Sequence, residues 1–269
     1  MRVRITFNVH NRGGLVPFHH QFLISGVFKN LLLADVNTRF RDYAFYSFSG
    51  LKGQTRLSRS GLHYNSRKVT IVISSASADF IGHLVNLVFE EKELTIGELK
   101  MSPDTAEEEL AVNLERGTKY VCISPLIIIP PDQGAEESKQ FVDPSLDAFS
   151  DLLYESTITR MSVYGIDVEA IPDAQKFQLV PDEHYLQKIR SANKKFARIY
   201  PLYDGEAKME ARGYTFPFTL YAAREIQEFI FTCGLGAECY KGFGMLDLAN
   251  SNPVERTVTI RSNEELIST

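Results

Sequence analysis

Hydrophobic positions in the first half of the chain follow two different periods. Apolar and polar residues alternate in "RVRITFNV" (2–9), which predicts a β-strand. In "QFLISGVFKNLLL" (21–33), apolar residues recur every three or four positions, which predicts a helix opened by Pro17. The same reasoning predicts strands at 42–51, 67–75 and 93–102 and an amphipathic helix at 78–91. The order strand, helix, strand, strand, helix, strand is typical of a ferredoxin-like domain.

The second half repeats this order less regularly. Its predicted elements are a strand at 119–129, a helix at 144–161, β-rich stretches at 196–203 and 214–222, a short helix or helix-to-strand passage at 223–234, and a strand at 243–249. We therefore expect an α+β chain with two tandem ferredoxin-like (RRM-like) domains. The polar segment Arg116–Thr118 predicts the boundary, giving an N-terminal domain at 1–117 and a C-terminal domain at 118–269.

The composition of the 269 residues fits a globular protein with a hydrophobic core, because 44% are hydrophobic and 23% charged. The apolar runs are too short to span a bilayer, and the start has no signal-peptide pattern, so we expect a cytoplasmic protein with no membrane partner. Cys122, Cys233 and Cys239 lack zinc-like spacing and are expected to be reduced thiols. The sequence also lacks an H-x-x-x-H pair or an Asp/Glu triad, so no metal site and no cofactor are predicted.

Charge is unevenly distributed, although the formal net charge is −5. Residues 39–68 carry seven Lys or Arg against one acid, and residues 188–198 carry five against none. Acids dominate elsewhere, with eight in residues 90–109 and seven in residues 132–155. A basic segment is by default a solvated face. Two such segments beside acidic ones favour a binding site for a polyanion such as nucleic acid.

The segment "CGLGAECYKGFGML" (233–246) holds four glycines as Gly-Leu-Gly, five residues, then Gly-Phe-Gly. It has neither the Gly-Lys-Ser/Thr of a Walker loop nor the context of a dinucleotide fingerprint. Glycines accept positive φ and close backbone approach. Free N–H groups in such a loop can hold phosphate oxygens, with Lys241 adding a positive charge. A hairpin with glycines at its bends is the alternative, but the doubled pattern, here called the glycine frame, favours a functional loop.

The glycine frame resembles the C-terminal signature of the CRISPR-associated endoribonucleases that cut the repeats of precursor guide RNA, members of the RAMP superfamily. Two further stretches resemble this family: "VPFHHQFLISGVF" (16–28), which opens the first predicted helix, and "ISPL" (123–126). The resemblance implies two ferredoxin-like domains, with CRISPR repeat RNA on a basic face or in the cleft between them. The candidate RNA-binding residues come from these matches and from the first basic segment: His20, Arg39, Lys52, Arg56, Gly234, Gly236, Lys241, Gly242 and Gly244.

The family's chemistry, as the resemblance implies it, needs no metal. The RNA's own 2′-hydroxyl attacks the adjacent phosphorus, which leaves a 2′,3′-cyclic phosphate and a 5′-hydroxyl end. Many members use a Tyr late in the first helix, a His in the next connection, and a Lys. Here Phe28 stands at the aromatic position, and the connection at 34–43 contains no histidine.

The catalytic candidates are therefore Lys29 and Arg41, for transition-state charge, and Tyr43, as a weak proton donor or positioning group. The alternative for Tyr43 is a core aromatic residue, and for Arg41 a surface cation.

Three histidines need separate interpretation, because two of them could contact RNA or take part in catalysis. His20 falls on the family's His-Gln pair at the start of the first predicted helix, where N–H groups attract phosphate, and is either a packed or capping residue or an RNA contact. His63 is an alternative base if its basic hairpin folds over the RNA. His83 lies in an amphipathic helix and is expected to be structural.

The leading hypothesis is a metal-independent endoribonuclease that cleaves CRISPR repeat RNA. The missing histidine leaves open a repeat-RNA-binding protein that does not cleave, and the shared domain type leaves open a structural RAMP subunit of a guide-RNA effector complex. A generic RNA-recognition module ranks last, because the aromatic RNP1 pattern is missing. A homodimer and handover of the product to a CRISPR effector complex stay open as further partners.

Overall fold

The computed structural model describes residues 1–129, 139–204 and 207–262, which form two compact units. The first unit contains Met1–Ala111, Tyr240–Gly242 and the segment from Asn252 onward. The second contains Val112–Cys239 and Phe243–Ser251. The sequence predicts a single boundary after residue 117, whereas two late segments belong to the first unit. Residues 132–138 of the acidic stretch lie outside the described residues.

The sheet of the first unit has the strand order β16-β8-β1-β6-β3, with β7 paired to β8 and all neighbours antiparallel. The strands are β1 (Arg2–Val9), β3 (Tyr46–Phe48), β6 (Lys68–Ser75), β7 (Leu94–Ile96), β8 (Leu99–Glu109) and β16 (Thr257–Ser262). The path β8-β1-β6-β3 is the fourth, first, third and second strand of a ferredoxin-like domain, as predicted. The prediction of one strand at 93–102 is wrong, because Gly97 (φ 62°) turns the chain into the β7–β8 hairpin.

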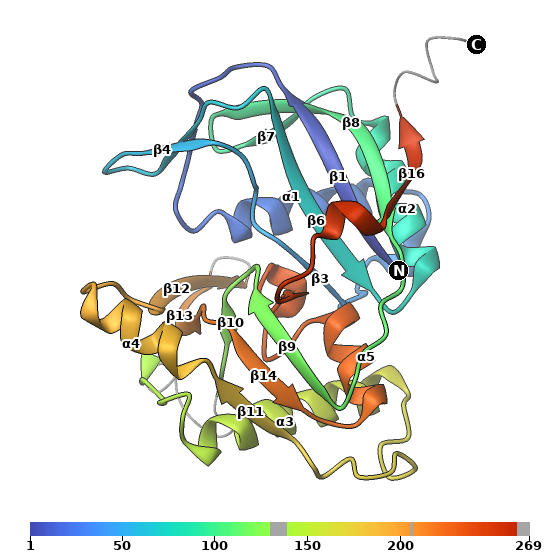
Figure 1. Cartoon of the computed structure of the whole chain (residues 1–269). Coiled ribbons are helices and arrows are strands. Elements are labelled where there is room, and N and C mark those ends of the chain that lie inside the picture. Colours follow the sequence, from blue (N-terminus) through green and yellow to red (C-terminus); the bar gives the residue numbers. More distant parts are fainter. Residues whose placement is uncertain (130–138, 205–206, 263–269) are drawn as a thin grey trace. The chain divides into compact units, whose positions relative to one another are not determined.

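Helices α1 (Gln21–Ala34) and α2 (Ala78–Glu90) lie against one face of this sheet (Figure 1). The Ser77 hydroxyl caps α2 by accepting a hydrogen bond from the Phe80 N–H at 3.1 Å. On α1, Phe28 packs edge-on against Phe48 of β3, with 5.2 Å between ring centroids. Burying a phenylalanine side chain of this kind contributes about 1.5–3 kcal/mol. The apolar residues that recur with a helical period in the sequence are thus the ones that face the sheet.

A buried carboxylate ties the late segment of the chain to the first unit. Glu109, whose side chain is 2% exposed, accepts hydrogen bonds from Arg2 Nε (2.7 Å), Arg4 Nη2 (3.2 Å) and Arg256 Nη2 (3.4 Å). Removing one partner of such a buried group is strongly destabilising, because it leaves uncompensated charge. Pairing of β16 with β8 and this cluster together place the segment around Arg256 in the first unit, which the sequence pattern did not predict.

A small second sheet in the first unit has the order β2-β5-β4, formed by β2 (Leu15–Val16), β4 (Thr55–Leu57) and β5 (Leu62–Tyr64). One face of it is buried through Val16 and Tyr64. The sequence predicts only a Gly- and Arg-rich connection here, because its strands are too short to show a period.

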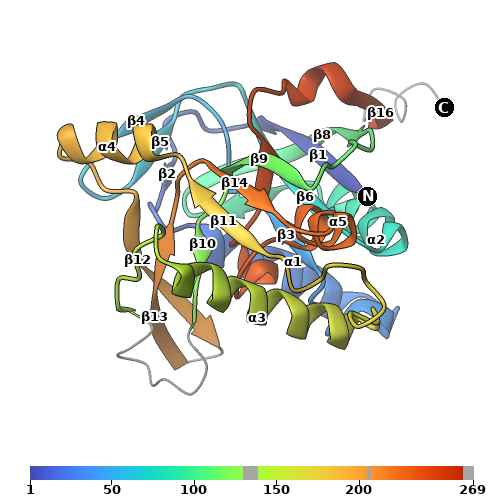
Figure 2. The same cartoon turned by 60° about the horizontal axis from the view of Figure 1, so that its bottom comes forward.

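The second unit repeats the ferredoxin-like order in the sheet β11-β14-β9-β15 (Figure 2). Its strands are β9 (Gly117–Cys122), β11 (Gln178–Pro181), β14 (Phe218–Tyr221) and β15 (Leu246–Leu248). Helices α3 (Asp147–Tyr164) and α5 (Arg224–Cys233) pack on one face of the sheet. The α+β fold of two tandem ferredoxin-like units is therefore confirmed.

An insertion between β11 and β14 distinguishes the second unit from the first. It contains α4 (Glu183–Ser191), β12 (Ala197–Asp204) and β13 (Ala207–Tyr214), and the sheet β10-β13-β12 joins it to β10 (Leu126–Ile127). The predicted strand at 119–129 is wrong as a single element, because the chain leaves one sheet at Ser124–Pro125 and enters another. The second basic segment covers the end of α4 and the start of β12.

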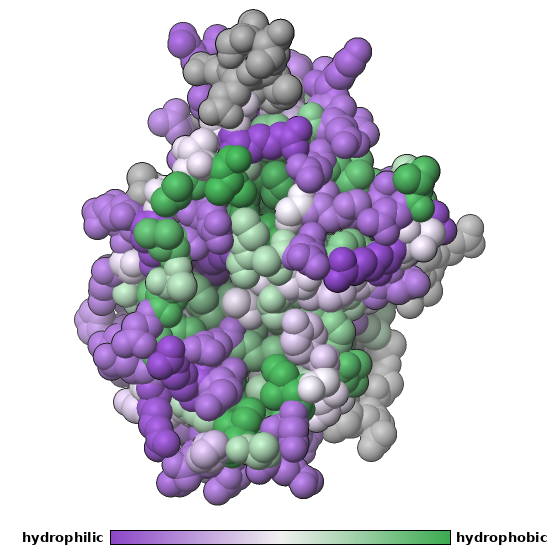
Figure 3. Space-filling view, turned by 90° about the vertical axis from the view of Figure 1, so that its right-hand side faces the viewer, coloured by the Kyte–Doolittle hydropathy of each residue, from purple (hydrophilic) through white to green (hydrophobic). Residues whose placement is uncertain are grey.

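Apolar residues on the face drawn in Figure 3 form small groups among hydrophilic ones. Exposed apolar residues of this kind are ordinary on a folded chain. No helix in the described ranges is both long enough and apolar enough to cross a bilayer. All three cysteines are free thiols, and burial raises the pKa of Cys239 to about 11, so this thiol is protonated at neutral pH.

Candidate nucleic-acid interface

A short 3₁₀ helix, η1 (Thr38–Phe40), follows α1 and contains Arg39, where the basic segment 39–68 begins. The Asn37 side chain starts it by accepting a hydrogen bond from the Arg39 N–H at 3.1 Å. Phe40 is buried and packs edge-on against Phe80 of α2 at 5.5 Å, which fixes the segment to the unit. Because Phe40 points inward, its two arginine neighbours are exposed.

The two arginines of this segment differ in their contacts. The Arg39 guanidinium lies 4.7 Å from the centre of the Phe40 ring and donates to Asp79 at 3.0 Å, in an exposed ion pair. Such pairs contribute about 0–1 kcal/mol, so the guanidinium can exchange Asp79 for another anion at little cost. Arg41 donates through Nη2 to the Asp35 carbonyl at 3.3 Å. Its other guanidinium nitrogens have no partner in the part of the chain that the structure covers.

Tyr43 and Lys29, the other two catalytic candidates, have contrasting environments. Tyr43 is half-buried; its ring lies 4.5 Å from that of Phe80, and its hydroxyl is 3.0 Å from Ser75 Oγ. These contacts hold the ring in place and favour a positioning role over proton donation. Lys29 is exposed on α1. The structure thus gathers Arg39, Arg41 and Tyr43 around Phe40.

His20 is buried and links the start of α1 to the chain after β3. Its Nδ1 donates to the Pro17 carbonyl (3.0 Å), and its Nε2 accepts from the Leu51 N–H (3.1 Å), which together require the neutral ring. Burial lowers the pKa of His20, consistent with this state. The helix begins at Gln21 after a turn, rather than at Pro17. Both ring nitrogens are hydrogen-bonded within the unit, so these contacts favour the interpretation of His20 as a packed residue.

The candidates Lys52 and Arg56 belong to the chain around the small β2-β5-β4 sheet. Lys52 is half-buried, and its backbone bridges to Thr70. Arg56 is exposed on β4, directly opposite His63 of β5. His63 Nδ1 donates to the Gly13 carbonyl at 2.8 Å. Arg56 and His63 therefore share the face of this sheet that is opposite the buried one.

The glycine frame is explained by close backbone packing. Gly236 (φ 85°) has no room for a side chain, because a Cβ would lie 2.4 Å from the Ile127 carbonyl oxygen. At Gly244 (φ 65°) a Cβ would lie 2.0 Å from the Leu235 oxygen, and at Gly242 (φ 90°) 2.5 Å from the Phe48 ring. Gly234 ends α5 with φ 83°. All four are buried. Glycine is needed at these positions because the fold requires a positive φ at all four and leaves little room for a side chain at Gly236, Gly242 and Gly244.

The N–H groups of the frame are partly engaged within the second unit. Leu235 N donates to the Gly244 carbonyl (2.9 Å), and Gly244 N donates to the Pro125 carbonyl (2.7 Å). Ala237 N donates to the Ile127 carbonyl at 2.9 Å. The idea that the glycine N–H groups cradle phosphate therefore does not hold for Gly244, whose N–H is already bonded.

Arg160 of α3 is a residue that sequence reasoning missed. Its Nη1 donates to the carbonyls of Gly234 (2.8 Å) and Gly236 (3.2 Å), and its Nη2 donates to that of Cys233. Hydrogen bonds from a charged donor are stronger than neutral ones. Arg160 thus braces the start of the glycine frame. Nothing in the local sequence indicated this, since the contacts join residues more than seventy positions apart.

The central part of the frame belongs to the first unit. Tyr240 packs against the core of that unit, and Lys241 Nζ lies 5.4 Å from the centre of the Tyr240 ring. A Cβ on Gly242 would also lie 3.1 Å from Gln21, which places this turn beside the start of α1. Lys241 is half-exposed, so it is the cation of the frame that solvent reaches.

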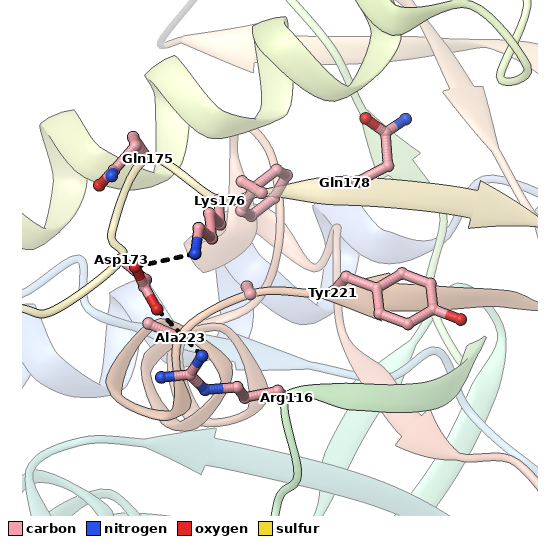
Figure 4. A pocket seen from close by; sticks show the side chains of 9 residues that line it. Arg116, Asp173, Gln175, Lys176, Gln178, Tyr221 and Ala223 are labelled. Atoms are coloured by element: carbon pink, nitrogen blue, oxygen red, sulfur yellow. Dashed lines mark hydrogen bonds and ion pairs between the residues drawn. The ribbon is translucent and has the colours of Figure 1, made fainter.

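A cavity of about 440 Å³ lies in the second unit, and none of the candidate residues of the sequence lines it (Figure 4). Asp173 accepts from Arg116 (3.0 Å) and Lys176 (3.1 Å) at its rim. Hydrogen bonds from Lys176 and then Arg116 lower the pKa of Asp173. Tyr221 of β14 and Gln178 of β11 complete this side of the cavity. Both cations are already paired with Asp173, and we assign no ligand to this cavity. No group of three or more His, Cys, Asp or Glu is arranged for a metal within the described ranges.

Solved structures define the class of fold. A structure described as an RAMP protein binding different RNA substrates is 19% identical, with a TM-score of 0.73 over 93% of this chain and 100% of that chain. One described as CRISPR associated protein Cas6 is 18% identical (TM-score 0.70; 93% and 99% covered). A third, from a Cas6-related gene of Pyrococcus furiosus, is 17% identical (TM-score 0.73; 94% and 99% covered). The chain thus shares its fold of two ferredoxin-like units with RAMP proteins.

Residues 106–248, more than half of the chain, match the family described as CRISPR associated protein Cas6, C-terminal. The matched range contains the whole glycine frame. The chain belongs to this Cas6 family of CRISPR-associated RAMP endoribonucleases. Among curated protein sequences, none matches the chain.

Proposed function

We propose that this chain binds CRISPR repeat RNA and cleaves it within the repeat without a metal ion. The observation that carries the proposal is the Cas6 family match over residues 106–248, which includes the glycine frame. The exposed cations of the first unit, Lys29 and Arg41, support it by offering positive charge for phosphate. One structural neighbour is described as binding different RNA substrates, which agrees with RNA as the ligand.

The proposed reaction is an internal transesterification. The 2′-oxygen loses its proton and bonds to the adjacent phosphorus, while the bond from phosphorus to the 5′-oxygen breaks. The products are a 2′,3′-cyclic phosphate and a 5′-hydroxyl end. Arg41, with guanidinium N–H groups that have no described partner, and Lys29 stabilise the charge of the phosphorane. Tyr43, held by Ser75, orients the segment that carries Arg41.

RNA binding extends, in this proposal, to the glycine frame and the basic residues of the first unit. Lys241 contacts a phosphate, and the four glycines act by shaping the loop that presents it. Arg39, Lys52 and Arg56 add phosphate contacts. The proposal also includes a homodimer of this chain and, after cleavage, handover of the product to a CRISPR effector complex.

A second candidate function is binding without cleavage. The observation that favours it is the absence of a histidine between Lys29 and Tyr43, where many family members have their base. His20 does not fill this role, because both of its ring nitrogens are hydrogen-bonded. A structural RAMP subunit would also bind RNA in this way, but within an effector complex.

The test is incubation of the purified chain with its cognate repeat RNA in EDTA. Cleavage to a 2′,3′-cyclic phosphate and a 5′-hydroxyl end supports the enzyme. A matched RNA with a single 2′-deoxy nucleotide at the cleaved position must stay intact, because it lacks the nucleophile. Tight binding with both RNAs intact would support the second candidate, and activity that EDTA abolishes would contradict the metal-independent reaction.

A further inference from the structure

A histidine and an aspartate meet where α1 and α2 come together in the first unit. His83 lies on α2, and Asp35 is the C-cap residue of α1. His83 Nε2 and Asp35 Oδ2 are 2.8 Å apart, and the two side chains are 20% and 13% exposed. The two atoms do not form an aligned hydrogen bond, so the contact is a close approach of the ring nitrogen to the carboxylate. The sequence prediction that His83 is structural did not include this partner.

The pair adjoins the basic segment that carries the proposed site. The Phe40 ring of η1 lies 5.4 Å from the His83 ring, centroid to centroid. Asp35 also connects the pair to Arg41, because its carbonyl accepts from Arg41 Nη2 while its carboxylate faces His83. An imidazole, its carboxylate partner and a guanidinium thus meet at one residue.

The second ring nitrogen of His83 is open. Its Nδ1 has no hydrogen-bond partner among the residues that the structure describes and is not buried, whereas Nε2 is buried against Asp35. His10 and His20 have both ring nitrogens engaged. His63 has one nitrogen bonded, but to the Gly13 carbonyl, which carries no full counter-charge. Of these four histidines, His83 is therefore the one that combines an open nitrogen with a carboxylate partner.

We propose that His83, supported by Asp35, is the general base of the RNA cleavage reaction. This inference rests on the proposed endoribonuclease function. His83 Nδ1 takes the proton of the 2′-hydroxyl as the 2′-oxygen bonds to phosphorus, and the 5′-oxygen leaves with the electron pair of its bond and takes a proton from water. Asp35 supplies the counter-charge for the imidazolium, and Arg41 stands at the phosphorane. A histidine on α2 thereby replaces the one missing from the connection after α1.

The experiment is single-turnover cleavage of the cognate repeat RNA by the full-length wild type, His83→Ala and His83→Gln, with RNA affinity and melting temperature measured for each. His10→Ala is the control, because His10 lies outside the proposed machinery, and His63→Ala tests the rival base. Removal of a general base lowers rates by about 10²–10⁴-fold. We expect a loss of this size in both His83 variants, RNA affinity within about threefold of wild type, and partial recovery of His83→Ala by added imidazole.

The outcomes separate this inference from the function on which it rests. If the wild type itself leaves RNA intact, the proposed cleavage fails, and the inference with it. If the wild type cleaves and the His83 variants cleave at the wild-type rate, only the inference is overturned. Loss of cleavage in His63→Ala instead, or a His83→Ala defect that imidazole never relieves, would also overturn it. If one of the two His83 variants does not fold, the other one serves for the test.

Discussion

Replacing Gly244 by alanine tests whether the glycine frame is built by close backbone packing. Gly244 has φ 65°, and an added Cβ would lie 2.0 Å from the Leu235 carbonyl oxygen. Gly165, the C-cap of α3 in the same unit, is the matched control. It also has positive φ (99°), but a Cβ there would meet nothing within 4 Å. The two substitutions therefore share the backbone strain and differ in the collision.

The expected magnitudes follow from this difference. A residue with Cβ at positive φ costs about 1–2 kcal/mol, which is all that Gly165→Ala should lose. Gly244→Ala must also separate the Cβ from the Leu235 oxygen. This movement breaks two short backbone hydrogen bonds, Leu235 N to the Gly244 carbonyl and Gly244 N to the Pro125 carbonyl. Each bond lost in this way leaves a buried group unsatisfied and costs about 1–3 kcal/mol, so we expect a total of roughly 3–8 kcal/mol.

Urea unfolding followed by circular dichroism measures this difference without a tryptophan, which the chain lacks. We expect Gly244→Ala to have a free energy of unfolding at least about 2 kcal/mol below that of Gly165→Ala. Equal losses in the two variants would refute the reasoning, because the collision would then contribute nothing. The frame would have to be explained in another way.

Three further outcomes are expected. Arg41→Ala should slow single-turnover cleavage about 10²-fold or more while RNA affinity changes little; a loss confined to affinity would contradict a transition-state role. Lys241→Ala should reduce the slope of log affinity against log salt by about 0.7–1, and an unchanged slope would remove its phosphate contact. Burial lowers the pKa of His20, so the unfolded chain binds the proton more readily. The free energy of unfolding should therefore fall as the pH drops below about 6.5, the ordinary pKa of histidine, by up to about 1.4 kcal/mol per pH unit. His20→Asn should flatten this dependence, and an unchanged pH profile would speak against a buried neutral ring.

The two ferredoxin-like cores could be predicted because their long elements have a visible period. The strand at 2–9 and the helix at 78–91 agree with β1 and α2 to within a residue. Short strands failed, because two or three residues such as β10 cannot show alternation. The pairing of β16 with β8 joins positions far apart in sequence, so no local pattern could indicate it.

The candidate site was predictable only in part. The glycine frame and the exposed arginines around Phe40 could be found from their spacing and charge. The brace from Arg160 and the pair between Asp35 and His83 could not, since each arises from tertiary contacts between elements. His83 looked like one more residue of an amphipathic helix, and only the end of α1 gives it a partner.

The pairing of β16 with β8 has a consequence for how the nascent polypeptide matures. Because Arg256 and strand Thr257–Ser262 finish the sheet that begins at Arg2, its edge at Thr105–Glu109 stays open while everything in between is translated. An unpaired strand edge is prone to wrong association. The domain made first by the ribosome is thus the one completed last, and a chain halted before residue 256 would leave Glu109 without its third arginine.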